Sequence, residues 1–151
     1  MRSCEGFVPT TLDTRTGSSS HDEYDALRPD VRDPACNDLE GSERFYNRLG
    51  FSRPEGAKPQ LGEPDTYRVL SNGKGGHLHL TDAVEGWLVP GRNPLGLHLR
   101  VEEVDDLAAE FARELAGKGP DDKRWGMYEF SLSDPDETLV RIGWPTRLRS
   151  R

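Results

Sequence analysis

The sequence predicts an α+β fold in which two βαβββ units form one curved, mixed β-sheet, with a cup inside and the helices on the outer face. Three observations support this prediction. Two segments have helical periodicity and end at glycine, and strand-like segments follow each of them. Equivalent residues of the two segments, such as Phe45 and Phe111, lie 66 positions apart. Such a period indicates two copies of one structural unit.

The first helix is expected between Asp38 and Gly50. Asp38 suits the N-cap because its carboxylate accepts hydrogen bonds from the free backbone N–H groups of the first turn. Gly50 suits the C-terminal stop. The residues that recur between them at helical spacing are Leu39, Ser42, Phe45, Tyr46 and Leu49.

Two strands are expected after this helix, over residues 66–70 and 77–81, with a glycine-rich turn between them. In the second strand, leucines alternate with His77 and His79. The alternation places the leucines on one face and both histidines on the other.

The second unit begins with an alternating strand over residues 95–101. A helix is expected next, starting at Glu103 or Asp105 and ending at Gly117 or Gly119. Its apolar stripe consists of Val104, Leu107, Ala108, Phe111, Ala112 and Leu115.

A β-hairpin is expected at the end of the second unit, with strands over residues 127–132 and 138–144. Glu129 and Arg141 lie on opposite strands of this hairpin. We expect an ordinary cross-strand ion pair between them, and the alternative is a catalytic role for the carboxylate.

The composition is that of a single-domain globular protein. The chain has 151 residues, of which 33% are hydrophobic and 31% charged, and its mean hydropathy is −0.78. No segment approaches the ~20 apolar residues of a membrane helix, and the first 20 residues lack the pattern of a signal peptide. The sequence therefore predicts a cytoplasmic protein without membrane contact. Cys4 and Cys36 are expected to be free thiols, because two distant cysteines form neither a disulfide framework nor a CxxC metal site.

The charge balance bears on the partners. Acidic residues outnumber basic ones by 27 to 20, which gives a net charge of −7. This argues against nucleic-acid binding, where a basic patch supplies most of the affinity. A small cationic ligand is favoured, although modest negative charge on a soluble protein mainly supports solubility.

Two sequence signatures resemble the vicinal oxygen chelate superfamily, which includes glyoxalase I, fosfomycin-resistance proteins, extradiol dioxygenases and bleomycin-resistance proteins. Residues 38–51 (DLEGSERFYNRLGF) resemble the first-helix motif of the family, and residues 125–136 (WGMYEFSLSDPD) resemble its late hairpin. Together with residues 101–107 (VEEVDDL), the resemblance spans roughly residues 35–145. It implies the predicted fold for the domain.

An N-terminal extension over residues 1–30 precedes this domain, which is expected to span residues 31–147. The extension is rich in Gly, Ser and charge, so part of it is expected to be disordered. The resemblance places the first strand of the family on residues 31–37, where charges and a proline interrupt the apolar pattern. Either that strand is irregular, or residues 7–12 form an edge strand that replaces it. If residues 7–12 do not form a strand, they are a mobile terminus.

The resemblance also implies a test for metal ligands. Metal-using members hold the ion with His, Gln or Glu on the inner faces of four strands, and the corresponding positions here are Val31, His79, Gly96 and Arg141. Only His79 is a ligand, and the guanidinium of Arg141 would repel a cation. The sequence therefore predicts no metal and no other cofactor.

The chain is especially similar to the bleomycin-resistance branch at residues 49–53, at residues 92–95 and at Trp125–Gly126. Members of that branch are dimers that bind the drug in clefts between subunits without modifying it. The resemblance thus implies a non-catalytic homodimer that sequesters a small molecule, such as a bleomycin-type glycopeptide, and so confers antibiotic resistance. Trp125 matches the tryptophan that stacks on the planar tail of the drug, although Pro54 and Glu55 replace an aromatic residue of the branch.

Two other functions remain open. If a metal is bound, His79 and His98 are its expected ligands, in a shifted constellation of His77, His79, His98 and Glu129. The chain would then be a metal-dependent glyoxalase-like lyase, thiol transferase or dioxygenase. The other alternative is a dimeric binding or regulatory protein with an unrelated ligand.

The residues expected to bind the ligand are Trp125, Trp87, His98, Arg100, Glu129 and Arg141. Trp125 either stacks on the ligand or fills the core, and Trp87, on a loop, is either a second stacking platform or an anchor of the dimer interface. Trp144 alternates with other apolar residues and is expected in the core.

Overall fold

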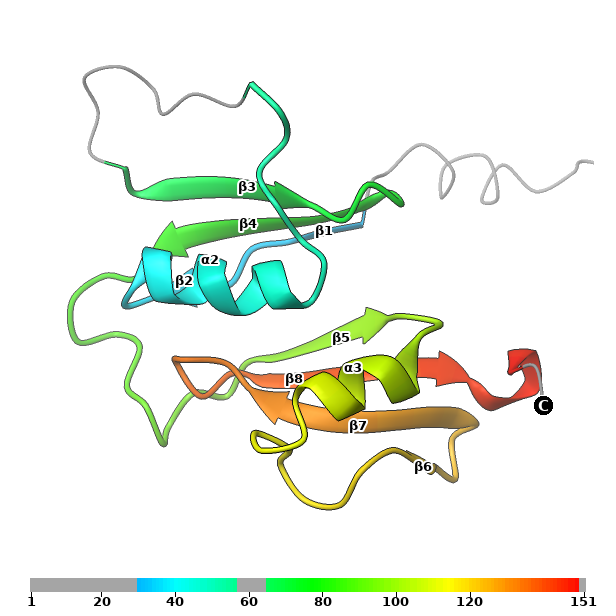
Figure 1. The fold of residues 1–151 in the computed structure, drawn as a ribbon. Coiled ribbons are helices and arrows are strands. Elements are labelled where there is room, and N and C mark those ends of the chain that lie inside the picture. The colour runs from blue at the N-terminus through cyan, green and yellow to red at the C-terminus, as the bar shows by residue number, and fades with distance from the viewer. Residues whose placement is uncertain (1–29, 57–64, 150–151) are drawn as a thin grey trace, which may run out of the picture.

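Two units of similar architecture follow each other along the chain (Figure 1). The structure is a computed structural model that describes residues 30–56 and 65–149, without the side chains of residues 30–32. Cys4 and the segment over residues 7–12 lie outside the described residues. The protein has the α+β fold with two βαβββ-like units that the sequence predicts, and the described strands pair as two four-stranded sheets rather than as one continuous sheet.

The first unit forms a four-stranded sheet, here called the first sheet. Its elements are β1 (Asp30–Arg32), β2 (Ala35–Cys36), α2 (Leu39–Arg48), β3 (Tyr67–Ser71) and β4 (Gly76–Asp82). Strand β4 pairs with β1 and β2 in parallel and with β3 in antiparallel orientation. Because β1 and β2 pair with β4 in the same register, they are one strand that is interrupted at Asp33 and Pro34. Proline has no N–H for a ladder bond, so the irregular first strand is the correct alternative.

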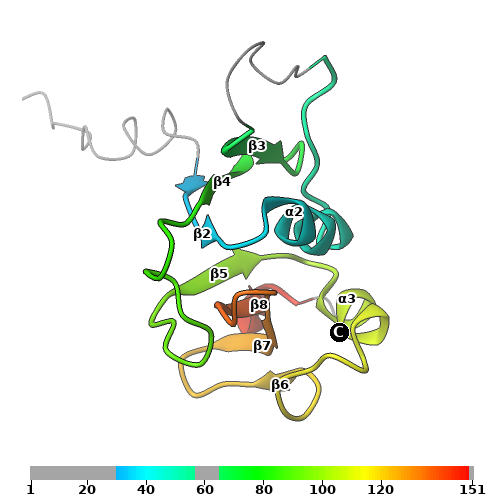
Figure 2. The same cartoon turned by 90° about the vertical axis from the view of Figure 1, so that its left-hand side faces the viewer.

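The second unit forms the second sheet, in the order β5-β8-β7-β6. Its elements are β5 (Gly96–Arg100), α3 (Val104–Glu110), β6 (Asp121–Asp122), β7 (Met127–Ser133), β8 (Leu139–Pro145) and the 3₁₀ helix η1 (Thr146–Leu148). Strand β8 pairs with β5 in parallel and with β7 in antiparallel orientation. Figure 2 shows both helices on the same side of the strands, as expected for helices on the outer face.

Local sequence explains α2 well but predicts α3 too long. Asp38 caps α2, since its carboxylate accepts from the Gly41 N–H at 3.0 Å, and Gly50 follows with a φ of 85°. In contrast, α3 ends at Glu110 rather than near Gly117. Leu115 instead forms a bridge with Leu132, and the Ala116 N–H donates to the Ser131 carbonyl at 2.9 Å. The free edge of β7 thus offers this segment partners that a longer helix would leave unpaired.

One hydrophobic core joins the two units. It contains the buried faces of both helices and the inward leucines, valines, isoleucines and phenylalanines of both sheets. Phe45 and Phe111, one from each repeat, meet at 5.9 Å between ring centroids. The equivalent phenylalanines therefore serve the packing of one unit on the other.

Cys36, which also lies in this core, is a free, buried thiol, and burial raises its pKa to about 11.

The turn between β7 and β8 fastens the second unit to the first. Asp136, 3% exposed, accepts from the Nδ2 of Asn37 at 2.7 Å and from its backbone N–H at 3.2 Å. Asp134, 4% exposed, accepts from the Tyr46 hydroxyl at 2.9 Å and from the backbone N–H of Thr138 at 2.8 Å. Burial raises the pKa of Asp134 above its usual value in spite of these hydrogen bonds. Each carboxylate thereby links α2 or the end of β2 to the late hairpin.

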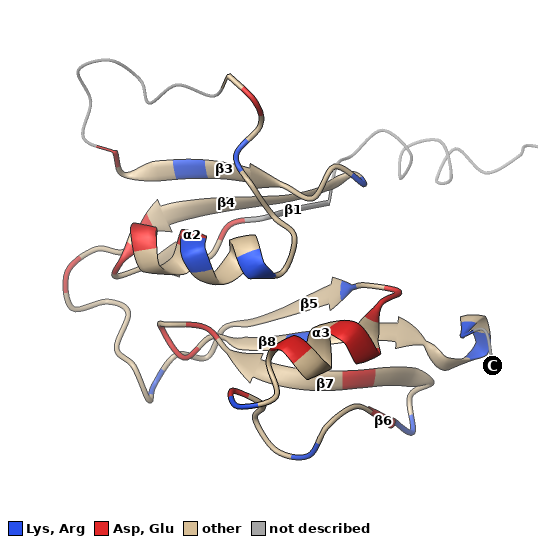
Figure 3. Ribbon diagram, in the orientation of Figure 1, with Lys and Arg blue, Asp and Glu red and all other residues tan. Residues whose placement is uncertain are grey.

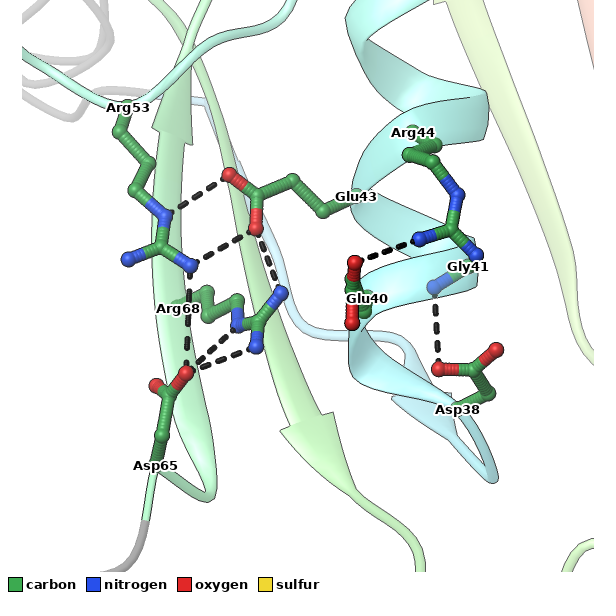
Figure 4. Close-up of polar contacts among 8 residues, drawn as sticks. All are labelled: Asp38, Glu40, Gly41, Glu43, Arg44, Arg53, Asp65 and Arg68. Carbon is green, nitrogen blue, oxygen red and sulfur yellow. Dashed lines mark hydrogen bonds and ion pairs between the residues drawn. The ribbon is translucent and has the colours of Figure 1, made fainter.

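Ion pairs fix α2 against β3 (Figure 4). Glu43 of α2 accepts from Nε and Nη2 of Arg53 at 2.7 and 2.8 Å, and from Nη1 of Arg68 at 2.6 Å. Arg68 also pairs with Asp65 at 2.7 Å. These contacts lower the pKa of Glu43. The group therefore ties the segment after α2 and strand β3 to the helix.

Charge is unevenly distributed over the two helices (Figure 3). Helix α2 carries residues of both signs, whereas the charged residues of α3 are all acidic.

Within the described part of the chain, no helix has the length and apolar character that crossing a membrane requires.

Candidate functional site

The candidate site is the face of the second sheet opposite α3, here called the open face. Leu97 and Leu99 of β5 are buried in the core, as are Val140 and Ile142 of β8. Because side chains alternate along a strand, His98 and Arg100 of β5 and Arg141 of β8 project from the open face, and all three are exposed. His98 pairs with Arg141 in the β5–β8 register.

Glu129 of β7 is the buried charge of this face. Its residue is 1% exposed, and its register partner on β8 is Gly143. A Cβ atom at residue 143 would lie 2.6 Å from the Cβ atom of Glu129, so the glycine leaves the space that Glu129 uses. Oε2 of Glu129 lies 3.8 Å from Nε2 of His98. The carboxylate is therefore close to an imidazole on the open face.

Trp125 stands beside this carboxylate. It precedes β7, and Gly126 has a φ of 81°, a left-handed conformation that favours glycine. The indole Nε1–H donates to Oε2 of Glu129 at 3.4 Å, while 65% of the residue is exposed. The alternative in which Trp125 fills the core is therefore wrong. Trp144 does pack against the core, as expected.

The expected ion pair between Glu129 and Arg141 is also wrong. The hairpin register places Arg141 opposite Ser131 and Glu129 opposite Gly143, so the two charged residues are diagonal neighbours. Among the described residues, Glu129 contacts His98 instead, at 3.8 Å between Oε2 and Nε2. The turn of residues 134–138 sets this register. Hydrophobic periodicity in the sequence predicts the two strands but not which residues face each other.

Trp87 lies apart from these residues. It belongs to the segment between β4 and β5, and 83% of it is exposed. Its neighbour Leu88 is buried, and the Leu88 carbonyl accepts from Asn37 Nδ2 at 3.1 Å. No hydrogen bond or aromatic contact found in the described regions joins Trp87 to the open face.

The histidines of the first sheet have their own surroundings. His79 of β4 accepts or donates a hydrogen bond at Nδ1 with the hydroxyl of Tyr67, and their ring centroids are 5.5 Å apart. Within residues 30–56 and 65–149, no three His, Cys, Asp or Glu side chains come together so that they could hold a metal ion. The shifted constellation thus reduces to the contact between His98 and Glu129.

A groove of about 1070 Å³ opens between the two units. It is bounded by the start of β4, the end of β5, the segment after α2 and one side of α3. Its lining includes Phe51, Lys74, His77, His98, Arg100 and Trp144, and also the acidic residues Glu102, Glu103, Asp106 and Glu110. The indole N–H of Trp144 is buried, and among the described residues it has no hydrogen-bond partner. Sequence analysis missed Phe51, Lys74 and Trp144 as groove residues, because the groove exists only where one unit meets the other.

Comparison with known proteins identifies the fold. No family model matches the sequence. No curated protein matches it either. Among solved structures, a bleomycin-binding protein complexed with bleomycin superposes with a TM-score of 0.58 at 20% identity, over 78% of this chain and 97% of the other.

Two further structures extend the comparison. TnmS3, an antibiotic binding protein from Streptomyces sp. CB03234, has a TM-score of 0.58 and 25% identity, with 78% of this chain and 95% of that chain covered. A member of the glyoxalase/bleomycin resistance protein/dioxygenase superfamily from Sphaerobacter thermophilus has a TM-score of 0.56 and 22% identity, with coverage of 78% and 97%. The chain therefore has the fold of the glyoxalase/bleomycin resistance/dioxygenase superfamily.

Proposed function

We propose that this protein binds a small planar organic molecule on the open face of the second sheet and leaves it chemically unchanged, so that it sequesters a drug. The observation that carries the proposal is Trp125. Its indole is 65% exposed, and an aromatic face of this size is suited to stacking on a planar ligand. Its N–H is held by the buried carboxylate of Glu129, which fixes the orientation of the ring.

A fixed, exposed indole is suited to stacking. Aromatic pairs contribute about 0.5–1.5 kcal/mol beyond the area that they bury. Because the hydrogen bond to Glu129 already restricts the ring, little side-chain entropy remains to be lost on binding. Arg141 projects from the same face, at a position where the family resemblance would require a metal ligand, which favours binding over metal chemistry.

The similar structures support a drug as the ligand. Two of them are named as a bleomycin-binding and an antibiotic binding protein. A bleomycin-type glycopeptide is therefore the first ligand to test. The proposal keeps the cytoplasmic location expected from the sequence.

We also propose that the protein forms a homodimer. The open face presents a single wall, and a second copy would supply the opposite wall of a cleft. Apolar residues are exposed on the segment between the units, namely Val84, Trp87, Val89 and Leu95. Such a concentration favours contact with a partner surface. Light scattering at tens of micromolar should give a mass of about twice the 16.9 kDa of one chain, and a monomer mass would contradict this part.

The binding experiment is a titration of the full chain with metal-free and copper-loaded bleomycin, followed by calorimetry and by tryptophan fluorescence. We expect heat and quenching, with a loss of affinity on Trp125→Ala of roughly 2-fold to 10-fold, from the stacking energy. Trp144→Phe serves as the control for an indole that is not on the open face. Mass spectrometry should recover the drug unmodified. Absence of both heat and quenching at near-millimolar drug would exclude this ligand, and a modified product would exclude a purely binding role.

A further inference from the structure

Three side chains with positive or hydrogen-bond-donating groups gather on the open face. His98 and Arg141 are register partners on neighbouring strands, which run about 4.8 Å apart. Arg100 lies two residues after His98 on the same face, a separation of about 6.7 Å along the strand. The three side chains therefore start within a triangle that one small ligand group can span.

The two arginines have no acidic partner in the described part of the chain. Arg48, Arg53 and Arg68 each have a carboxylate oxygen within 4.0 Å, but no such contact exists for Arg100 or Arg141. Four other described arginines also lack a carboxylate contact, but they lie on turns, connecting segments or η1 rather than on paired strands. These are Arg92, Arg113, Arg124 and Arg147. The pairing of β5 with β8 thus holds two unneutralised guanidinium groups on one rigid surface.

Glu129 does not neutralise this surface. It lies on the same face, but its contacts are with His98 and with the indole of Trp125, and it is 1% exposed. The exposed ionisable side chains that β5 and β8 place on the open face are His98, Arg100 and Arg141, with no carboxylate among them. The exposed carboxylate of Asp121 lies farther away, on β6 beyond Glu129.

A surface of this kind recognises oxyanions. A guanidinium presents a planar fork of N–H donors that matches the geometry of carboxylate and phosphate oxygens. Two such groups that repel each other are stabilised when an anion lies between them. Arg100 and His98 also line the groove between the units, but four acidic residues of its lining disfavour an anion inside it, so we place the anion on the open face. These four are Glu102, Glu103, Asp106 and Glu110.

We propose that His98, Arg100 and Arg141 form a binding site for a carboxylate, phosphate or sulfonate group. The ligand that stacks on Trp125 would then be an aromatic molecule with an anionic substituent, rather than the cationic one that the net charge of the chain favours. This inference rests on the proposed function for the aromatic part of the ligand, but the anion site itself depends only on the three donors.

The test uses four probes on the full, ¹⁵N-labelled chain: 2-naphthoate, neutral 2-naphthamide, a cationic naphthylmethylamine and inorganic phosphate. Binding is followed by calorimetry and by NMR of the arginine Nε–H groups, with Arg100→Gln and Arg141→Gln identifying the signals. We expect phosphate and naphthoate to shift both signals, and naphthoate to bind at least about threefold more tightly than the amide or the amine. Raising the salt concentration should weaken naphthoate binding and leave the amide unaffected.

The variants separate this site from general electrostatics. Arg141→Gln and Arg100→Gln should each raise the dissociation constant of naphthoate at least about threefold, and Arg141→Lys should restore part of the loss. Arg113→Gln is the matched control, because it removes the same charge from an exposed position after α3 and should have no effect. Equal affinity for naphthoate and naphthamide, or the same response in Arg113→Gln as in Arg141→Gln, would overturn the anion site.

The outcomes also separate the two proposals. If the amide binds as well as the naphthoate and Trp125→Ala weakens both, the aromatic site stands and the anion site fails. If phosphate shifts the arginine signals but no aromatic probe binds, the anion site stands and the proposed stacking function fails. If no probe binds at concentrations up to about 10 mM, where even a weak surface contact would be detected, both proposals fail.

Discussion

Glu43 provides the sharpest test of how the first unit is held together. Its carboxylate receives three hydrogen bonds from two guanidinium groups, at 2.6 to 2.8 Å, in the network of Figure 4. The side chains of Glu43 and Arg68 are only 14% and 12% exposed, so solvent screens their attraction weakly. Glu43→Gln keeps the shape and one acceptor oxygen but removes the charge.

The expected cost follows from these contacts. Breaking a hydrogen bond to a charged group costs about 1.5–3 kcal/mol. Two features reduce the total cost of losing the charged contacts of Glu43. Arg53 is 33% exposed, and Asp65 continues to pair with Arg68. We therefore expect Glu43→Gln to lower the free energy of unfolding by about 2 kcal/mol, which corresponds to a melting temperature lower by about 4–8 °C for a chain of this length.

The pKa of Glu43 adds a dependence on pH. Since the pKa is lowered in the folded state, the ionised carboxylate stabilises the fold above the ordinary value of 4.5, and this stability is lost as the pH falls through the folded pKa. The difference between wild type and Glu43→Gln should therefore be largest near pH 7 and should shrink well below pH 4.5. Urea denaturation at several pH values measures it.

A neighbouring residue supplies the control for Glu43. Glu40 pairs with Arg44 on the same helix, but the side chains are 73% and 63% exposed. Glu40→Gln should cost no more than about 0.5 kcal/mol. If the two variants are equally stable, or if the effect of Glu43→Gln does not change with pH, the network does not hold α2 against β3 in the way described.

Two further substitutions test packing and buried polarity, each against a matched partner. Tyr46→Phe removes a buried hydroxyl that donates to Asp134, so it should lower the free energy of unfolding by about 1.5–3 kcal/mol in urea denaturation, whereas Tyr128→Phe removes a hydroxyl from an exposed contact and should cost less than about 1 kcal/mol. Gly143→Ala should cost about 1–3 kcal/mol in thermal unfolding, because its Cβ atom would lie 2.6 Å from a side-chain carbon of the neighbouring strand, while Gly96→Ala has 3.5 Å and should be tolerated. A reversed order in either pair would show that the contacts do not limit stability.

The features that could be predicted from the sequence are those that local chemistry decides. Asp38 and Gly50 delimit α2 because a cap and a left-handed residue act within one turn. The alternation of His98 and Arg100 with buried leucines placed both on one face, as observed. Pro34 likewise suggested an irregular first strand, one of the two alternatives that the sequence left open, since proline cannot donate a ladder hydrogen bond.

The remainder depends on contacts between distant segments. The end of α3 could not be predicted from its apolar stripe, because Leu115 is captured by the edge of β7. The buried carboxylates of Asp134 and Asp136 resemble ordinary turn residues in the sequence, yet their partners Tyr46 and Asn37 lie 88 and 99 residues away. Net charge does not locate charged groups on the open face, since a sum over the chain contains no information on which strands pair.

The turn at one end of the late hairpin also determines the chemistry of the open face. The hydrogen bonds of Asp134 and Asp136 fix the register in which Glu129 meets Gly143 and Arg141 meets Ser131. A slip by one residue would move every side chain of a strand to the opposite face. Glu129 would then enter the apolar core, where a carboxylate without partners costs several kcal/mol. The buried turn and the buried glutamate therefore enforce the same register, and the projection of Arg141 from the same face as Glu129 is its consequence.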